Sequence, residues 1–232
     1  MKLKKIASLM LAGIMAVSML AACGDANSNG GNGGEGEGEG TQTSGYSAVM
    51  AENVSKAVKD KEFVTFQDNA ADQAALNKSV NFLSGKSVEE VAANQKIVTL
   101  VDVAATSADR WSEDWELMAD SLQSELKMHN ENMAFDDMDF SWFNSNKAMN
   151  EDRKCAVLYA VNGAVGTDEA VQTVAEKLSK LDSLVDEAKD TNSNTTWHYE
   201  YVVSVSVAEK SYNDSAAKFI LVTVDRTVTN NK

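Results

Sequence analysis

Histidine, cysteine and proline are the scarcest residues in this chain of 232 amino acids, which has two histidines, two cysteines and no proline. Average usage would supply roughly a dozen prolines in a chain of this length. Triads of the Ser-His-Asp type require a histidine, and zinc sites commonly use one. Neither His129 nor His198 lies in a recognisable motif of either kind. The sequence therefore assigns no catalytic residue, no metal site and no cofactor.

Glycine is concentrated in one segment and scarce elsewhere. Nine of the 13 glycines fall between Gly24 and Gly45, and only three follow this segment. A Gly-rich polar chain cannot bury a core and behaves as a flexible coil. The whole chain is nevertheless 44% hydrophobic, enough to build a core in the remainder. We therefore expect a tether over residues 23–45 and a single globular domain over residues 46–232.

The first 23 residues combine basic, apolar and small side chains in a defined order. Three lysines among the first five residues precede an apolar run over residues 6–22, which leads into the sequence LAAC. This order is typical of a signal peptide with a cleavage point after small residues. The LAAC tetrapeptide resembles the lipobox of bacterial lipoprotein precursors. The resemblance covers residues 1–23 only and implies that residues 1–22 are removed and that Cys23 becomes the lipidated first residue. An ordinary secretory signal or an uncleaved anchor is the alternative.

Acidic residues outnumber basic ones by 35 to 21, which gives a formal net charge of −14. Cleavage before Cys23 would remove three lysines and leave a net charge of −17. A protein this acidic repels phosphate backbones, so we expect no nucleic-acid partner. Two or three acyl chains on Cys23 would anchor the protein stably. The membrane is therefore an expected partner, with the domain on the extracytoplasmic side of a bacterial cell membrane.

Apolar residues at helical spacing predict five helices in the domain. The clearest lies in the first half of the domain, where Trp115, Met118 and Leu122 share one stripe. Gly85 is expected just beyond the end of a helix, and Ser87 is expected to cap the next one with Glu90. The expected helices are Tyr46–Lys61, Asn69–Ser84, Ser87–Asn94, Ser107–Asn130 and Thr167–Asp190, the last of them capped by its first residue.

Apolar runs and alternating patterns predict the strands. Between residues 195 and 208, aromatic and valine residues alternate with polar ones such as Ser204 and Ser206, which predicts one buried and one wetter face. The expected strands are Glu62–Gln67, Lys96–Ala104, Lys154–Val161, Thr195–Ala208 and Ala216–Val228, the last two forming a hairpin. From residue 96 onward the order is β-α-β-α-β-β. We expect an α+β fold with a mixed or antiparallel four-stranded sheet, helices mainly on one face, and additional N-terminal helices.

Residues 131–153 have no clear periodicity and interleave aspartates with aromatic residues. Long loops in compact domains often bind ligands or partners. The spacing lacks the glycine of an EF-hand, which argues against a calcium loop of that type. A lid or a satellite core is the alternative to a binding role. The candidate binding residues in this loop are Asp136, Asp137, Asp139 and Trp142.

The lipobox and the tether, with no recognised catalytic motif beside them, predict a membrane-anchored extracytoplasmic lipoprotein. Its domain would be a non-catalytic binding or scaffolding module for a protein or a cationic peptide. One alternative is a hydrolase that pairs an aspartate of the 136–139 segment with Glu200 across a cleft. Another is the solute receptor of a transporter, although the domain is small for the usual form with two α/β lobes.

Overall fold

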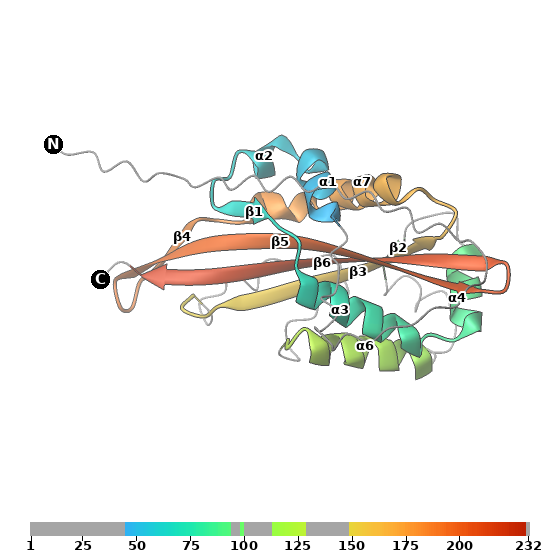
Figure 1. Cartoon of the computed structure of the whole chain (residues 1–232). Coiled ribbons are helices and arrows are strands. Elements are labelled where there is room, and N and C mark those ends of the chain that lie inside the picture. Colours follow the sequence, from blue (N-terminus) through green and yellow to red (C-terminus); the bar gives the residue numbers. More distant parts are fainter. Residues whose placement is uncertain (1–44, 94–97, 100–112, 129–148, 231–232) are drawn as a thin grey trace, which may run out of the picture. The chain divides into compact units, whose positions relative to one another are not determined.

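The computed structural model of the protein describes residues 45–93, 98–99, 113–128 and 149–230 (Figure 1). The expected signal peptide and nearly all of the expected tether lie outside the described residues. The helices are α1 (Tyr46–Asn53), α2 (Lys56–Lys59), α3 (Ala70–Ser79), α4 (Gly85–Ala93), α6 (Glu113–Glu125) and α7 (Thr167–Lys177), with 3-10 helices η1 (Val80–Phe82) and η3 (Ser179–Ser183). The strands are β1 (Val64–Phe66), β2 (Val98–Thr99), β3 (Arg153–Asn162), β4 (Glu187–Asp190), β5 (Thr195–Tyr212) and β6 (Ser215–Asn230).

The described strands form one mixed sheet. Its order is β1-β5-β6-β3-β2, and β4 also pairs with β5. β1 runs parallel to β5, and the other described pairings are antiparallel. The four strands expected from residue 96 onward are adjacent in this sheet as β5, β6, β3 and β2. The fold is therefore α+β with a mixed sheet, but β1 and β4 make that sheet wider than the expected four strands.

β5 and β6 are the longest strands and form the expected hairpin. Their pairing extends from Trp197 opposite Asn230 to Tyr212 opposite Ser215. The turn between them holds Asn213, whose φ of 51° is left-handed. Asparagine adopts this backbone conformation more readily than most residues. The chain therefore reverses here without glycine or proline.

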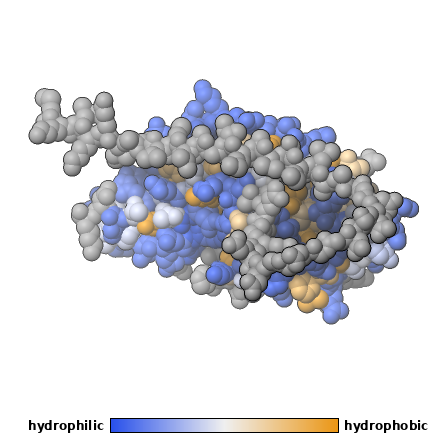
Figure 2. Space-filling model, in the orientation of Figure 1, coloured by the Kyte–Doolittle hydropathy of each residue, from blue (hydrophilic) through white to orange (hydrophobic). Residues whose placement is uncertain are grey.

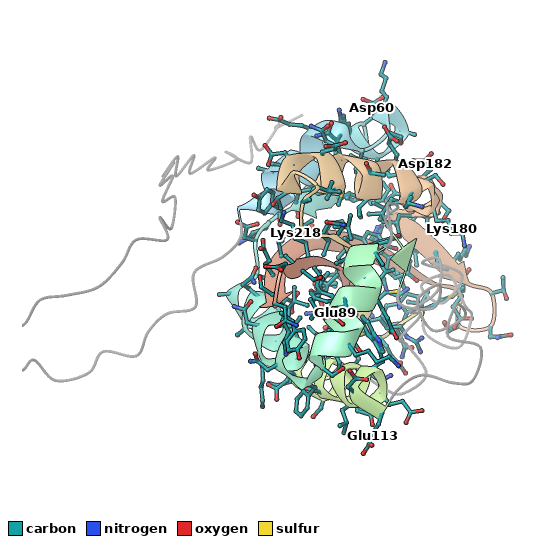
Figure 3. All side chains as sticks on the ribbon, turned by 90° about the vertical axis from the view of Figure 1, so that its right-hand side faces the viewer. Asp60, Glu89, Glu113, Lys180, Asp182 and Lys218 are labelled. Atoms are coloured by element: carbon teal, nitrogen blue, oxygen red, sulfur yellow. The ribbon has the colours of Figure 1, made fainter. Side chains whose placement is uncertain are left out.

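Helices cover both faces of the sheet (Figures 1 and 3), so the expectation of helices mainly on one face is wrong. The first face packs on α1, α2 and α7, and the second face packs on α3, α4 and α6. In Figure 3, Asp60 and Asp182 lie on one side of the sheet and Glu113 lies on the other. The described domain is therefore a helix–sheet–helix sandwich.

Two features explain why the second face is covered. The right-handed crossover rule constrains connections between parallel strands, whereas β2 and β3 are antiparallel. The rule therefore does not force α6 onto the face that α7 occupies. On β5, the expected wetter face carries Ser204 and Ser206, which are only 2% and 1% exposed because α3 packs against this strand.

The first expected helix is interrupted near its middle. Val54 is extended, with a ψ of 164°, and ends α1. The Ser55 hydroxyl then accepts a hydrogen bond from the Val58 N–H at 3.3 Å and starts α2. A serine that caps a new helix thus divides a segment whose apolar spacing alone indicated one continuous helix.

The helix expected over residues 167–190 is correct only in its first half. α7 ends at Lys177, and its N-cap is Gly166 rather than Thr167. The chain then forms η3 and β4, and Glu187–Asp190 pairs with the start of β5. The edge of β5 offers partners for the backbone N–H and C=O groups of this segment, and sheet pairing overrides the helical spacing.

The start of α4 also differs from the expected capping. Gly85 is the first residue of α4, and Ser87 lies inside the helix. The Ser84 hydroxyl accepts from the Ser87 N–H at 3.3 Å. Asp114, at the start of α6, accepts from the Ser84 N–H at 2.8 Å and from the Ser87 hydroxyl at 2.5 Å. A carboxylate distant in sequence therefore ties α4 to α6.

Side chains close the edge of β5 beyond its short pairing with β1. The Val205 N–H donates to the Ser47 hydroxyl at 2.9 Å. The Gln73 side-chain amide donates to Val207 O at 2.9 Å and accepts from the Val207 N–H at 3.2 Å. These bonds replace a neighbouring strand, so this part of the edge is satisfied within the domain.

Gly163→Ala tests the close packing of β3 against the hairpin. An added Cβ at Gly163 would lie 2.5 Å from the Ala216 Cβ and 2.8 Å from its backbone carbon. We expect the free energy of unfolding to fall by about 1–3 kcal/mol in urea denaturation of the full chain. Gly166→Ala is the control, because its added Cβ would meet only Glu169 Cβ at 3.9 Å. Equal losses for the two variants would contradict this account.

Candidate ligand-binding groove

The candidate residues from the sequence are only partly described. Those outside the described residues are Cys23, His129, Asp136, Asp137, Asp139 and Trp142. Cys155 is buried in β3 at 6% exposure, as expected of a thiol that serves packing. His198 Nδ1 lies 3.8 Å from Glu187 Oε2 on β4, and Glu200 is exposed on β5. None of these described residues lines either of the two cavities described below.

On the second face, a lysine joins two aspartates beside α3. Lys154 Nζ lies 2.6 Å from Asp72 Oδ1 and 3.3 Å from Asp225 Oδ2. The Thr223 hydroxyl donates to Asp72 Oδ2 at 2.6 Å. Asp72 is 2% exposed, so both of its oxygens are engaged inside the fold. Elements α3, β3 and β6 thus converge on one charged cluster.

Asp225 is the accessible end of this cluster. Its side chain is 36% exposed, compared with 3% for that of Asp72. Burial raises the pKa of Asp225, the positive charge of Lys154 opposes that rise, and the negative charge of Asp72 adds to it. A carboxylate whose pKa is perturbed by burial and by specific neighbours, at the edge of a cavity, is a candidate functional group.

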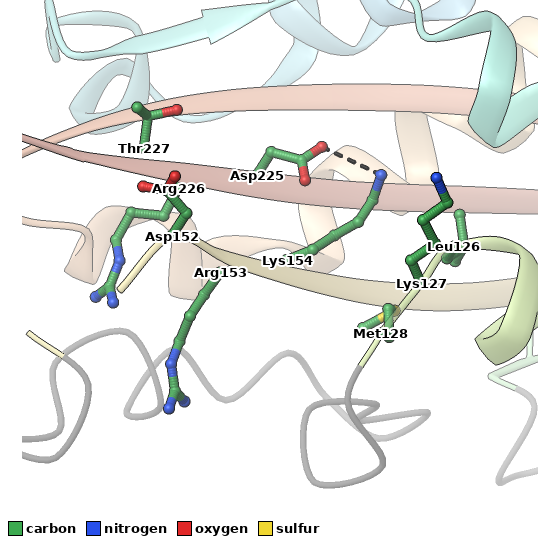
Figure 4. A pocket seen from close by; sticks show the side chains of 9 residues that line it. All are labelled: Leu126, Lys127, Met128, Asp152, Arg153, Lys154, Asp225, Arg226 and Thr227. Atoms are coloured by element: carbon green, nitrogen blue, oxygen red, sulfur yellow. Dashed lines mark ion pairs between the residues drawn. The ribbon is translucent and has the colours of Figure 1, made fainter. Parts of the chain in front are cut away.

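One cavity beside Asp225 has a volume of about 370 Å³ (Figure 4), and we call it the lysine cavity. It lies between the end of α6 and the paired strands β3 and β6. Lys127 and Lys154 extend toward the same side as Asp225, whereas Arg153 and Arg226 point away from them (Figure 4). The charged side chains that line the cavity are therefore two lysines, two arginines and two aspartates, Asp152 and Asp225.

The backbone at the end of α6 positions Lys127. This residue has a φ of 54°, a left-handed conformation that glycine usually supplies at a helix end. The Met128 N–H donates to Gln123 O at 3.1 Å, which completes the helix-terminating turn. The conformation is unusual for a lysine and directs its exposed side chain to the rim of the cavity.

A second cavity of about 360 Å³ extends from Asp225 toward β5, and we call it the α3 cavity. The segment Gln67–Ala70, which leads into α3, forms one wall, and Val202 and Ser204 of β5 form another. Ser204 is 2% exposed, and its hydroxyl has no hydrogen-bond partner among the described residues. A buried hydroxyl without a partner is uncommon and destabilising.

Asp225 lines both cavities, and we refer to the two cavities together as the Asp225 groove. The groove offers carboxylate, ammonium, hydroxyl and amide groups, which bind polar or charged molecules through hydrogen bonds and ion pairs. Each cavity is large enough for a small molecule. Among the described residues, no three His, Cys, Asp or Glu side chains are grouped so as to hold a metal ion. The groove is therefore suited to a small polar ligand.

A second charged cluster, on the first face, has a structural role and includes Arg226, which also lines the lysine cavity. Arg226 is 1% exposed, and its guanidinium lies 4.7 Å from the centroid of the Tyr199 ring. It donates to Glu151 O at 2.8 Å, and the Tyr199 hydroxyl donates to Met149 O at 3.1 Å. Burial raises the pKa of the neighbouring Tyr201 to about 12. These contacts hold the segment before β3 on the sheet, and β3 in turn carries Lys154 of the groove.

Comparison with family models, with curated proteins and with solved structures gave no match for this chain. Within the described residues, no helix is both long enough and apolar enough to cross a membrane. The proposed function therefore depends on the groove and on the sequence itself.

Sequence patterns gave little indication that Asp72, Lys154 and Asp225 would lie together at the groove. Asp72 lies four residues before the buried Leu76 on one helix face, an unusual place for a charge. Lys154 precedes the apolar run of β3, and Asp225 follows the apolar run of β6. In the sequence, both resemble ordinary polar residues at the end of a strand. They are opposite each other only because β3 pairs with β6 in this register. The sequence alone could not place them together.

Asp72→Ala tests the buried cluster. The substitution would leave Lys154 with Asp225 alone and the Thr223 hydroxyl without its acceptor. We expect the free energy of unfolding to fall by about 3 kcal/mol in urea denaturation. The control is Glu125→Ala, which removes an exposed ion pair with Lys78 and should cost less than about 1 kcal/mol. A loss for Asp72→Ala no larger than the control would refute a stabilising cluster.

Asp225→Asn tests the raised pKa through its effect on stability. Because folding raises this pKa, the folded protein holds the proton more tightly, and the ionised carboxylate disfavours folding. The stability of the variant relative to wild type should therefore rise between pH 3 and pH 7. Asp190→Asn is the opposite control, because hydrogen bonds from Ser193 and Asn192 lower the pKa of Asp190. Its relative stability should fall over the same interval, and urea denaturation at both pH values measures the two trends.

Proposed function

We propose that this protein is a membrane-anchored extracytoplasmic bacterial lipoprotein whose domain is a non-catalytic binding module. The anchor is supported by the basic N-terminus, the apolar run and the LAAC sequence that ends at Cys23. The observation that supports binding is the Asp225 groove, where three elements bring charged groups to the edge of two cavities.

Binding accounts for the groove better than hydrolysis does. A hydrolase with paired carboxylates needs two acids that can reach a substrate, 5–10 Å apart. In the groove, both oxygens of Asp72 are engaged, by Lys154 and by Thr223, and its side chain is 3% exposed. Of this pair, only Asp225 can reach a ligand, so the pair supplies one of the two acids that hydrolysis needs. The other carboxylates in the cavity walls, Asp68 and Asp152, each accept a backbone N–H, from Ser47 at 3.2 Å and from Val228 at 2.7 Å.

The domain architecture does not favour the transporter-receptor alternative. Receptors of that kind usually close two α/β lobes around their solute. The described residues form one sheet with a helix layer on each face, and both cavities open at the sheet rather than between lobes. A single-lobed binding module is the simpler proposal.

The surface favours a polar partner over an apolar one. On the face drawn in Figure 2, hydrophilic residues predominate and hydrophobic ones appear in small patches. The large hydrophobic side chains that are exposed in the described part of the chain come from four separate segments and are Phe82, Leu117, Val185 and Tyr212. The hydrophilic character of the drawn face therefore favours recognition of a polar partner.

Cys23→Ala tests the anchor. Cells that express the full chain are fed an alkyne fatty acid, and the purified protein is examined for the label and for its partition into a detergent phase. We expect the wild type to carry the label and to enter the detergent phase, and Cys23→Ala to lose the label and to be released from membranes. Cys155→Ala is the matched control, because it removes the other, buried cysteine and should keep the label.

Two outcomes would overturn the anchor proposal. The first is continued membrane retention of Cys23→Ala. The second is an unchanged label in Cys23→Ala, which would show that the modification does not depend on the lipobox cysteine.

A further inference from the structure

The geometry points to the α3 cavity as a binding site for a primary ammonium group, as found in alkylamines and polyamines. This inference rests on the proposed binding function and names the class of ligand. Three features support it: the unpartnered hydroxyl of Ser204, the negative charge of the cavity wall, and the cap that already binds the N–H groups at the start of α3.

Ser204 supplies the first argument. It is 2% exposed and lines the cavity, and its hydroxyl has no partner among the described residues. Ser206 has the same kind of buried hydroxyl two residues further on, but it does not line the cavity. A ligand with an N–H donor would give the Ser204 oxygen the hydrogen bond that the described fold does not supply.

The charge of the cavity gives the second argument. Its described lining includes the carboxylates of Asp68 and Asp225 and no basic residue. Lys154 contacts Asp225 but is shared with the buried Asp72, so one ammonium serves two carboxylates. A bound cation would complete the charge balance, whereas an anion would meet two carboxylates.

The N-terminus of α3 does not reverse this preference. A free helix N-terminus attracts anions through its unpaired N–H groups. Here the Asn69 side-chain oxygen accepts from the Ala71 N–H at 3.0 Å and from the Asp72 N–H at 3.3 Å. These two N–H groups are therefore bonded to the helix's own cap. The carboxylates of the cavity wall then determine that a bound ligand should carry a positive charge.

An ammonium group suits the acceptor chemistry of the cavity wall as well as its charge. It has three N–H donors and no acceptor, and the cavity wall offers the oxygens of Asp68, Ser204 and Asp225. A volume of about 360 Å³ accommodates a short aliphatic chain behind the ammonium. A neutral polyol of the same size would leave the carboxylates without a counter-charge.

The test is a calorimetric titration of the full chain in detergent with n-butylamine hydrochloride, with n-butanol as the uncharged probe of similar shape. We expect the amine to bind with a Kd in the millimolar range and the alcohol not to bind. Ser204→Ala should weaken amine binding at least fivefold, while Ser206→Ala should change it less than twofold. Because both variants remove a buried hydroxyl from one strand face, their folding and Tm should change alike.

The inference is overturned if butylamine does not bind, if butanol binds as tightly, or if the two serine variants have equal affinities. Any of these results would leave the lipid anchor untouched. Conversely, a labelling result that contradicts the anchor would not change the titration. The two proposals can therefore be refuted independently.

Discussion

The antiparallel pairing of β5 with β6 is the interaction on which the other described elements depend. β3 pairs with β6 along its whole length, from Arg153 to Asn162, and β1 and β4 pair with β5. The helix layers pack on the two surfaces that these strands create. A slip of one residue in the hairpin would move every side chain to the opposite face. The short turn at Asn213 therefore fixes the register of β5 against β6.

Burial on both faces restricts where a polar side chain can lie on the central strands. A buried polar group must find a partner inside the fold or weaken it. Thr223 meets this requirement through Asp72, and Arg226 meets it through Glu151 and the Tyr199 ring. Asp225 follows Thr223 by two residues on the same face and is the first of these side chains to reach solvent. The groove begins at this point, beside the end of α6 and the start of α3.

Some strands and helices could be predicted because the order of apolar and polar residues within one short segment shows which of its side chains are buried. Residues 154–161 read as a buried strand, and β3 has apolar side chains buried on both faces. The end of the helix expected from Thr167 could not be assigned correctly, because its apolar spacing fits a helix while the backbone of Glu187–Asp190 pairs with β5. In the same way, Ser204 and Ser206 looked solvent-facing because a serine is polar, and only the packing of α3 buries them.

By itself, the sequence determined the acidic balance, the LAAC sequence at Cys23, the long hairpin and most helix positions, because each depends on composition or on neighbours a few residues apart. Tertiary structure alone decided that helices cover both faces, that Asp114 ties α4 to α6, and that a groove forms at Asp225. The physical reason is distance along the chain. Asp72 is 82 residues from Lys154 and 151 from Thr223, and only the strand register and the packing of α3 bring their charged and polar atoms into contact.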